Sequence, residues 1–190
     1  MSQIYISSDF HFGHQREFLY VPHGFKSIEE HDNQIIENWN SVVSSEDTAY
    51  ILGDLMLGDN EHGIECISAL NGNLKVIFGN HDTDTRAHLY EQLPNVEVLG
   101  FGARLKYKHY HFYLSHYPTL TSNFDYDKPL KQQVINLCGH SHTKDWAADA
   151  DKGLIFHCEL DTNNCYPWLL DDIIENLKEY KNFINYNSSI

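Results

Sequence analysis

Positive charge is scarce in this sequence of 190 residues: 13 Lys and Arg stand against 27 Asp and Glu, a formal net charge of −14. A domain that grips long nucleic acid through its phosphates usually carries a basic stripe, and none is visible here, so we do not expect extended nucleic-acid binding. There is also no apolar run of 18 or more residues and no basic, apolar leader segment. We therefore expect a soluble, cytoplasmic protein with no membrane partner.

Cysteine is scarce too, and the four positions, Cys66, Cys138, Cys158 and Cys165, show no CxxC spacing. A cytosolic domain of this length needs no disulfides, so we expect reduced and mostly buried thiols. The apolar fraction of 42% excludes disorder for the bulk of the chain. The length predicts one domain over residues 1–184, followed by a frayed tail at 185–190. The sequence leaves the oligomeric state open.

The hydrophobic pattern changes between the two halves of the chain. In the first half, predicted strands at 4–7, 48–52 and 74–78 alternate with predicted helices at 28–44, 64–70 and 83–93. This alternation predicts a parallel sheet with right-handed crossovers. The second half has short predicted strands at 96–99, 103–107, 110–115, 134–138 and 154–158, and a helix at 171–183. We therefore expect a second sheet packed on the first. The predicted fold is α/β, a four-layer α/β/β/α sandwich with two packed mixed β-sheets flanked by helices.

Polar clusters follow five of the predicted strands. They are Asp9-x-His11, Gly53-Asp54, Gly79-Asn80-His81-Asp82, Ser115-His116 and Gly139-His140-Ser141-His142. Ligands bind outside the carboxyl ends of strands in open α/β sheets, so five strand ends can aim these side chains at one point. A Gly before the polar residue, present in three clusters, suits a backbone that turns sharply.

The chemistry of the clusters favours divalent metal ions. Asp, His and Asn without Cys suit borderline to hard ions and argue against a structural zinc site. The candidate ligands number seven: Asp9, His11, Asp54, Asn80, His116, His140 and His142. Seven are too many for one ion and natural for two ions about 3.5–4 Å apart that share a bridging carboxylate.

The order of these clusters carries a resemblance. The signature D-x-H, G-D, G-N-H-[D/E], H and G-H-x-H runs in sequence from Asp9 to His142, as in the calcineurin-like metallophosphoesterases. The segments 9–14 and 114–118 are similar to those of the small single-domain bacterial and phage members. The resemblance implies that Asp54 bridges the two ions. One ion would bind Asp9, His11, Asp54 and His142, and the other would bind Asp54, Asn80, His116 and His140.

The resemblance also implies a reaction, the in-line attack on phosphorus by a hydroxide that bridges the two ions. His81 is similar to the family's histidine that hydrogen-bonds the phosphate and protonates the leaving oxygen, and Asn80 also contacts that phosphate. We expect Mn²⁺ as the metal, with Fe, Zn²⁺ and Ni²⁺ as alternatives. Because metal binding needs neutral imidazoles, activity is expected to fall below about pH 6.5.

Other residues near the predicted site have weaker assignments. His14 and Arg16 are candidate contacts for the substrate phosphate, and Asp82 is expected to cap a helix. Four aromatic residues, Tyr117, Phe124, Tyr126 and Trp146, are candidates for stacking a base. Cys138 is expected to be an apolar strand residue. The histidines outside the signature, His23, His31, His62, His88, His109, His111 and His157, are expected to pack or to lie at the surface.

The sequence thus predicts a metal-dependent phosphoesterase that acts on a phosphodiester or a small phosphorylated metabolite. One alternative is a DNA or RNA nuclease that uses the same site, against which the acidic charge counts. Another is a non-catalytic scaffold of the same fold, which the retention of His81 and all seven ligands disfavours.

Overall fold

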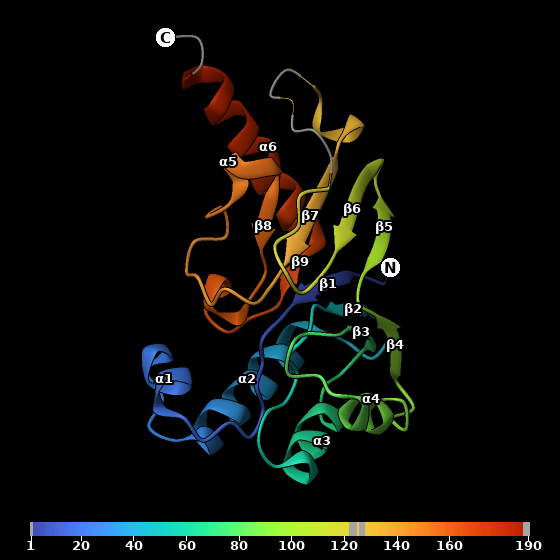
Figure 1. The fold of residues 1–190 in the computed structure, drawn as a ribbon, viewed down its shortest axis with the longest axis vertical. Coiled ribbons are helices and arrows are strands. Elements are labelled where there is room, and N and C mark those ends of the chain that lie inside the picture. Colours follow the sequence, from blue (N-terminus) through green and yellow to red (C-terminus); the bar gives the residue numbers. More distant parts are fainter. Residues whose placement is uncertain (1, 122–124, 126–127, 188–190) are drawn as a thin grey trace.

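The computed structural model describes residues 2–121, 125 and 128–187 of the chain (Figure 1). The first of its two sheets has five strands in the order β4-β3-β2-β1-β9. The strands are β1 (Ile4–Ser7), β2 (Thr48–Ile51), β3 (Asn73–Ile77), β4 (Val96–Gly100) and β9 (Trp168–Leu169). Strands β1 to β4 run parallel, and β9 lies antiparallel to β1, so the sheet is mixed.

The second sheet has the order β5-β6-β7-β8 and is mixed as well. Its strands are β5 (Ala103–Tyr107), β6 (Tyr110–Leu114), β7 (Val134–Cys138) and β8 (Ile155–His157). A hairpin makes β5 antiparallel to β6, whereas β7 pairs in parallel with both neighbours. The prediction of two mixed sheets is confirmed.

One strand was assigned to the wrong sheet. We expected residues 96–99 in the second sheet, but β4 lies at the edge of the first sheet and pairs in parallel with β3, Leu74 opposite Val96. The reason is the crossover through α4 (Asp84–Tyr90), because a strand–helix–strand unit returns its second strand parallel to the first in the same sheet.

The remaining helices are α1 (Glu17–Tyr20), α2 (Ile28–Val42), α3 (Asn60–Ser68), α5 (Ala150–Gly153) and α6 (Leu170–Asn187), with short 3₁₀ turns η1 (Val21–His23), η2 (Leu130–Gln132) and η3 (Leu160–Asn163). Ser27 caps α2 by accepting the backbone N–H of Glu30. Helix α3 begins before the predicted Ile64 because Asp59 caps it. Helix α6 continues to Asn187, into the predicted tail, and residues 188–190 lie outside the described part.

Two apolar cores build the layers. The first lies between the first sheet and helices α2, α3 and α4, which Figure 1 shows below that sheet, and Ile51 and Trp39 belong to it. The second joins the other face of the first sheet to the second sheet and to α6, as Ile6, Leu137 and Ile173 show. Successive residues of a strand point to opposite faces, so Tyr5 enters one core and Ile6 the other.

All four cysteines are free thiols and buried, as predicted. Within the described ranges 2–121, 125 and 128–187, none of the helices combines the length and hydropathy needed to cross a membrane.

Candidate metal centre

The predicted ligands follow strands that are neighbours in space. Asp9, Asp54 and Asn80 come shortly after β1, β2 and β3, which lie side by side in the first sheet. His116 and His140 come shortly after β6 and β7, neighbours in the second sheet. The carboxyl ends of these strands therefore bring the polar clusters to one place, as the sequence pattern predicted.

The backbone of this region is strained. Five of the candidate ligands have positive φ angles: Asp9 (61°), His11 (49°), Asp54 (55°), His140 (79°) and His142 (47°). Residues other than Gly rarely adopt this left-handed backbone conformation, which costs on the order of 1–3 kcal/mol per residue. Such strain persists where the surrounding structure holds the chain, and its concentration on these five residues is typical of a functional site.

Glycine is needed here for close approach as well as for turning. Gly53 has the positive φ that we expected before a polar cluster. Gly79 does not, but a Cβ added there would lie 2.1 Å from Asp54 Oδ1. At Gly139 an added Cβ would lie 2.3 Å from Asp9 Oδ2. These two glycines leave room for the carboxylates.

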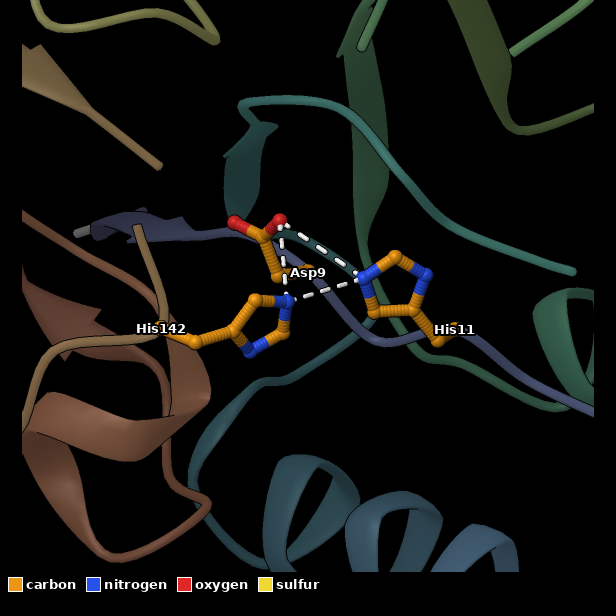
Figure 2. Close-up of side chains that lie close together, drawn as sticks. All are labelled: Asp9, His11 and His142. Carbon is orange, nitrogen blue, oxygen red and sulfur yellow. Dashed lines mark hydrogen bonds and ion pairs between the residues drawn. The ribbon is translucent and has the colours of Figure 1, made fainter. Parts of the chain in front are cut away.

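One group of ligand atoms comprises Asp9 Oδ1, His11 Nε2 and His142 Nε2, and Figure 2 shows the three side chains pointing toward one another. The two Nε2 atoms lie 3.1 Å apart. Asp9 Oδ1 is 3.7 Å from His11 Nε2 and 3.8 Å from His142 Nε2. One ion could bind all three atoms at ordinary metal–ligand distances.

A second group adjoins the first. Asn80 Oδ1 lies 2.9 Å from His116 Nε2 and 2.9 Å from His140 Nδ1. Asp54 joins the two groups, because its Oδ2 is 3.8 Å from His11 Nε2 and 3.6 Å from His116 Nε2. The structure therefore brings all seven predicted ligands together, with Asp54 between the two groups.

The hydrogen bond of His116 Nδ1 shows which nitrogen of this ring is free to bind a metal ion. His116 Nδ1 lies 2.9 Å from the Leu52 carbonyl, so it carries the proton and leaves Nε2 with a lone pair. That lone pair faces Asn80 Oδ1, which is also an acceptor, at hydrogen-bond distance. Asp9 Oδ1 is buried and has no hydrogen-bond partner among the described residues. A cation placed between such acceptors would satisfy them, and a metal ion fits that position.

Burial sets the protonation of the first group. The pKa of His11 is lowered to about 2, mainly by burial and then by the neighbouring His142 and His81, so its ring is neutral and able to bind metal. Burial raises the pKa of Asp9 to about 7, against the opposing pull of His116 and His142. Without metal, this carboxyl group therefore holds a proton up to near neutral pH.

His81 lies beside the ligands with its ring half-exposed. Its backbone N–H donates to Asp54 Oδ1 at 2.9 Å, and its Nε2 is 4.0 Å from Asp54 Oδ2. Arg86, which the sequence reasoning did not single out, donates to the His81 carbonyl. The ring of His81 is thus held near the Asp54 carboxylate and remains accessible from the cavity.

Asp82 was wrongly expected to cap a helix. Thr83 caps α4 instead, and Asp82 Oδ2 accepts the backbone N–H groups of Asp54 and Gly79 at 2.7 and 2.8 Å. Its Oδ1 accepts the hydroxyl of the buried Tyr90 at 2.8 Å. Asp82 therefore holds together the two loops that carry Asp54 and Asn80.

A cavity of about 180 Å³ lies over the ligands. It is lined by His11, His14, Phe18, Leu19, Asp54, Leu57, Asn80, His81, His140 and His142. His14 thus reaches the site, whereas Arg16 lines a neighbouring pocket with Gly13 and Asp59. Tyr117 does not line the cavity itself, but it is half-exposed and its ring centroid lies 4.7 Å from that of His140, which does.

Of the other aromatic candidates, the structure describes Trp146, which does not line this cavity. Trp146 stacks on Phe156, with ring centroids 4.6 Å apart, and packs against the second core. Phe124 and Tyr126 lie outside the described residues. Cys138 is fully buried in β7, as expected.

Asp161 is a further part of the site that the sequence reasoning missed. Its Oδ2 lies 3.0 Å from His142 Nδ1, and its Oδ1 lies 2.9 Å from Nε2 of His23. A signal for it exists in the sequence, because Glu159 and Asp161 are acidic residues that directly follow the predicted strand 154–158, as the five clusters follow theirs.

Comparisons with known proteins agree with this geometry. The calcineurin-like phosphoesterase superfamily domain matches residues 3–157. The chain belongs to the calcineurin-like phosphoesterase superfamily. Membership implies divalent metal ions, and the converging groups described above are suited to hold them.

Relatives of this chain occur in an archaeon and a phage. The uncharacterized protein MJ1445 of Methanocaldococcus jannaschii is 36% identical over 132 residues, 66% of this chain and 65% of that protein. The gene 66 protein of Mycobacterium phage L5 is 38% identical over 85 residues, 43% of this chain and 41% of that protein. The matched region thus spans less than two thirds of either relative.

A solved structure shares the fold. A protein of unknown function from Aquifex aeolicus superposes with a TM-score of 0.69 at 22% identity, over 92% of this chain and 99% of that one. The resemblance supports the two-sheet architecture.

Proposed function

We propose that this protein is a dimetal phosphoesterase that hydrolyses a small phosphodiester. The observation that carries the proposal is the convergence of nitrogen and oxygen ligand atoms on both sides of Asp54, which suits two cations side by side. Phosphoryl transfer is a reaction for which such a pair of ions is well suited.

The seven residues divide by position. Asp9, His11 and His142 would hold one ion and Asn80, His116 and His140 the other, with Asp54 binding both. Octahedral nitrogen and oxygen ligation makes Mn²⁺ the first candidate, ahead of Fe, Zn²⁺ and Ni²⁺. When bound, the two ions supply a water of lowered pKa for in-line attack and neutralise charge on the phosphoryl group.

The chain itself supplies groups for the leaving oxygen and the phosphate. His81 has an accessible ring near Asp54, where it can donate a proton to the departing oxygen. Asn80 directs Oδ1 toward His116 and His140, which leaves its amide N–H groups available to a phosphate oxygen. His14 lines the same cavity and is a third candidate contact.

The size of the site and the charge of the chain favour a small substrate. The cavity is about 180 Å³, and the formal net charge of −14 provides no long basic groove. Two bound divalent ions make the site itself locally positive, so a short phosphate ester meets the metals rather than the average charge.

Hydrolysis of bis-(p-nitrophenyl) phosphate by metal-free protein reloaded with Mn²⁺ tests the proposal. Asp54→Ala should lose both metal binding and hydrolysis. His81→Ala should keep two ions and lose about 10²–10⁴-fold in kcat. His88→Ala, which removes an exposed histidine of α4, is the matched control and should behave as wild type. Full activity of Asp54→Ala or of His81→Ala would refute the proposal.

A substrate panel then separates phosphoesterase from nuclease. Monoesters, linear diesters, 2′,3′- and 3′,5′-cyclic nucleotides and single-stranded DNA should be compared at equal metal loading. We expect the highest kcat/KM for a small diester. A strong preference for single-stranded DNA would assign the site to a nuclease instead.

A further inference from the structure

A second group of metal-binding side chains lies away from the dimetal centre, where α3 packs on α2. Asp32 comes from α2, and His62 and Cys66 lie one turn apart on the same face of α3. His62 Nε2 is 2.8 Å from Asp32 Oδ2 and 3.4 Å from Cys66 Sγ. One ligand atom from each residue lies within 4.8 Å of the others.

Hydrogen bonding alone pairs His62 Nε2 with Asp32 or with Cys66, but not fully with both at once. Its Nε2 carries either one proton or one lone pair. With a proton it donates to Asp32, and the sulfur is left as a weak second acceptor. With a lone pair it accepts from the Cys66 thiol and faces the Asp32 carboxylate acceptor to acceptor. A cation placed among the three atoms satisfies all of them at once.

The burial of the three residues is graded in a way that suits a bound ion. Asp32 is 1% exposed and Cys66 is 5% exposed, so the carboxylate and the sulfur are enclosed. The His62 side chain is 37% exposed, which gives an ion and a water molecule access from solvent. Burial, with Asp32 and Glu65 nearby, raises the pKa of Cys66 to about 12, so metal binding would release the thiol proton.

We propose that Asp32, His62 and Cys66 form a zinc-type site, separate from the dimetal centre, with water as the fourth ligand. Oxygen, nitrogen and sulfur together are ligands that Zn²⁺ accepts, and a thiolate disfavours Mn²⁺ and Mg²⁺. Tetrahedral zinc places such ligand atoms about 3.3–3.6 Å apart. The observed spacings of 2.8 and 3.4 Å need only a small opening to reach this geometry.

This site touches the loop of the dimetal centre. Gly13, two residues after His11, donates its backbone N–H to Asp32 Oδ2 at 2.9 Å. Asp32 Oδ1 lies 2.9 Å from Nδ1 of the buried His31, which orients the carboxylate. An ion on Asp32 therefore stiffens the loop that carries His11. The proposed site stands on its own contacts and does not depend on what reaction the dimetal centre performs.

Cobalt substitution tests the site by a spectrum rather than by activity. The seven proposed ligands of the dimetal centre include no sulfur, so a thiolate-to-cobalt charge-transfer band must come from a cysteine. Metal-free wild-type protein titrated with Co²⁺ should develop this band in the near ultraviolet, and excess Zn²⁺ should abolish it. Cys66→Ser should lose the band, with binding at this site weakened by at least the roughly 10–100-fold that loss of an outer-shell partner costs.

Two further variants make the result decisive. Cys165→Ser is the matched control, because Cys165 is also a buried thiol beside a histidine, with Sγ 2.8 Å from Nδ1 of His23, and it should keep the band. His62→Gln changes a partly exposed residue and should lose the band in a folded protein, as circular dichroism can verify. No thiolate band in wild type at saturating Co²⁺, or a band that survives Cys66→Ser or folded His62→Gln, would overturn the proposal.

Discussion

The carboxylate of Asp161 contacts Nδ1 of His142, the ring nitrogen that does not face the other ligands. Asp161 Oδ2 lies 3.0 Å from His142 Nδ1, which places the ring proton on Nδ1 and directs the Nε2 lone pair toward Asp9 Oδ1 and His11 Nε2. A carboxylate in this position fixes both the tautomer and the orientation of a histidine ligand. His142 is the most exposed member of its ligand group, so it depends most on such a partner.

Removal of Asp161 should therefore weaken metal binding. We expect Asp161→Ala to reduce Mn²⁺ affinity by about 10–100-fold, the usual effect of losing the hydrogen-bond partner of a ligand. Isothermal titration calorimetry of metal-free protein with Mn²⁺ measures this affinity. Asp149→Ala, which removes a comparable partner from His157 outside the ligand groups, should leave the affinity unchanged. Equal effects of the two variants would speak against the role of Asp161.

Metal affinity should depend on pH through Asp9. Burial raises its pKa to about 7, so below that pH an ion must displace a proton from the carboxyl group. His11, with its pKa lowered to about 2, is neutral throughout this range and adds no dependence. The pKa of His142 is raised above 6.5, because Asp161 and Asp9 outweigh the effect of burial, so this ligand must also release a proton. Affinity for Mn²⁺ should therefore rise by at least about tenfold per pH unit up to about pH 7 and flatten above the pKa values of both groups. Titrations from pH 5 to 8 check this, and a constant affinity would contradict it.

The absence of a side chain at Gly79 should be essential for metal binding. A Cβ there would lie 2.1 Å from Asp54 Oδ1, so Gly79→Ala must displace the Asp54 carboxylate. We expect loss of both ions and a decrease of about 1–3 kcal/mol in the free energy of unfolding.

Gly100→Ala is the control for that substitution. Its φ of +86° strains an alanine, but an added Cβ meets nothing within 4 Å in the described part of the chain. This variant should lose stability by about 1 kcal/mol and still bind metal. Metal analysis with thermal unfolding distinguishes the two variants. Two ions bound to Gly79→Ala would show that the carboxylate tolerates the shift.

The His23–Asp161 pair should stabilise the metal-free protein below high pH. The hydrogen bond to Asp161, then that to Cys165, raises the pKa of His23 from 6.5 to about 10. Because the pKa is higher in the folded state, this stabilisation is complete below about pH 6.5 and is lost as the pH rises through about 10.

Thermal unfolding between pH 6 and 10.5 measures that loss. We expect the Tm of wild type to fall more steeply across this window than that of His23→Gln, with about 2–4 °C for each kcal/mol lost in a chain of this size. His88→Gln, which changes an exposed histidine, should follow wild type. Parallel curves for His23→Gln and wild type would rule out the pair as the source.

Much of the fold could be predicted from the sequence because local signals agreed with the topology. Strand β7 matched its predicted bounds, and helix α2 begins at the predicted Ile28. The predictions failed where a distant partner decides. Strand β4 has an ordinary short apolar pattern, and only its pairing with β3 assigns it to the first sheet. The two-residue strand β9 has no period of its own and exists through its pairing with β1.

The sequence by itself determined which ligands meet, since each polar cluster directly follows a strand and the carboxyl ends of neighbouring strands lie together. Tertiary structure alone decided how they are held. The group that contacts His116 Nδ1 is the Leu52 carbonyl, and because every residue has a backbone carbonyl, no residue type marks this partner in the sequence. Asp161 contacts His142 only because tertiary packing brings the two residues together. The same holds for Asp32 and His62, brought together by two packed helices. Hydrogen-bond partners far apart in sequence leave no local pattern, because their distance is set only when the layers pack.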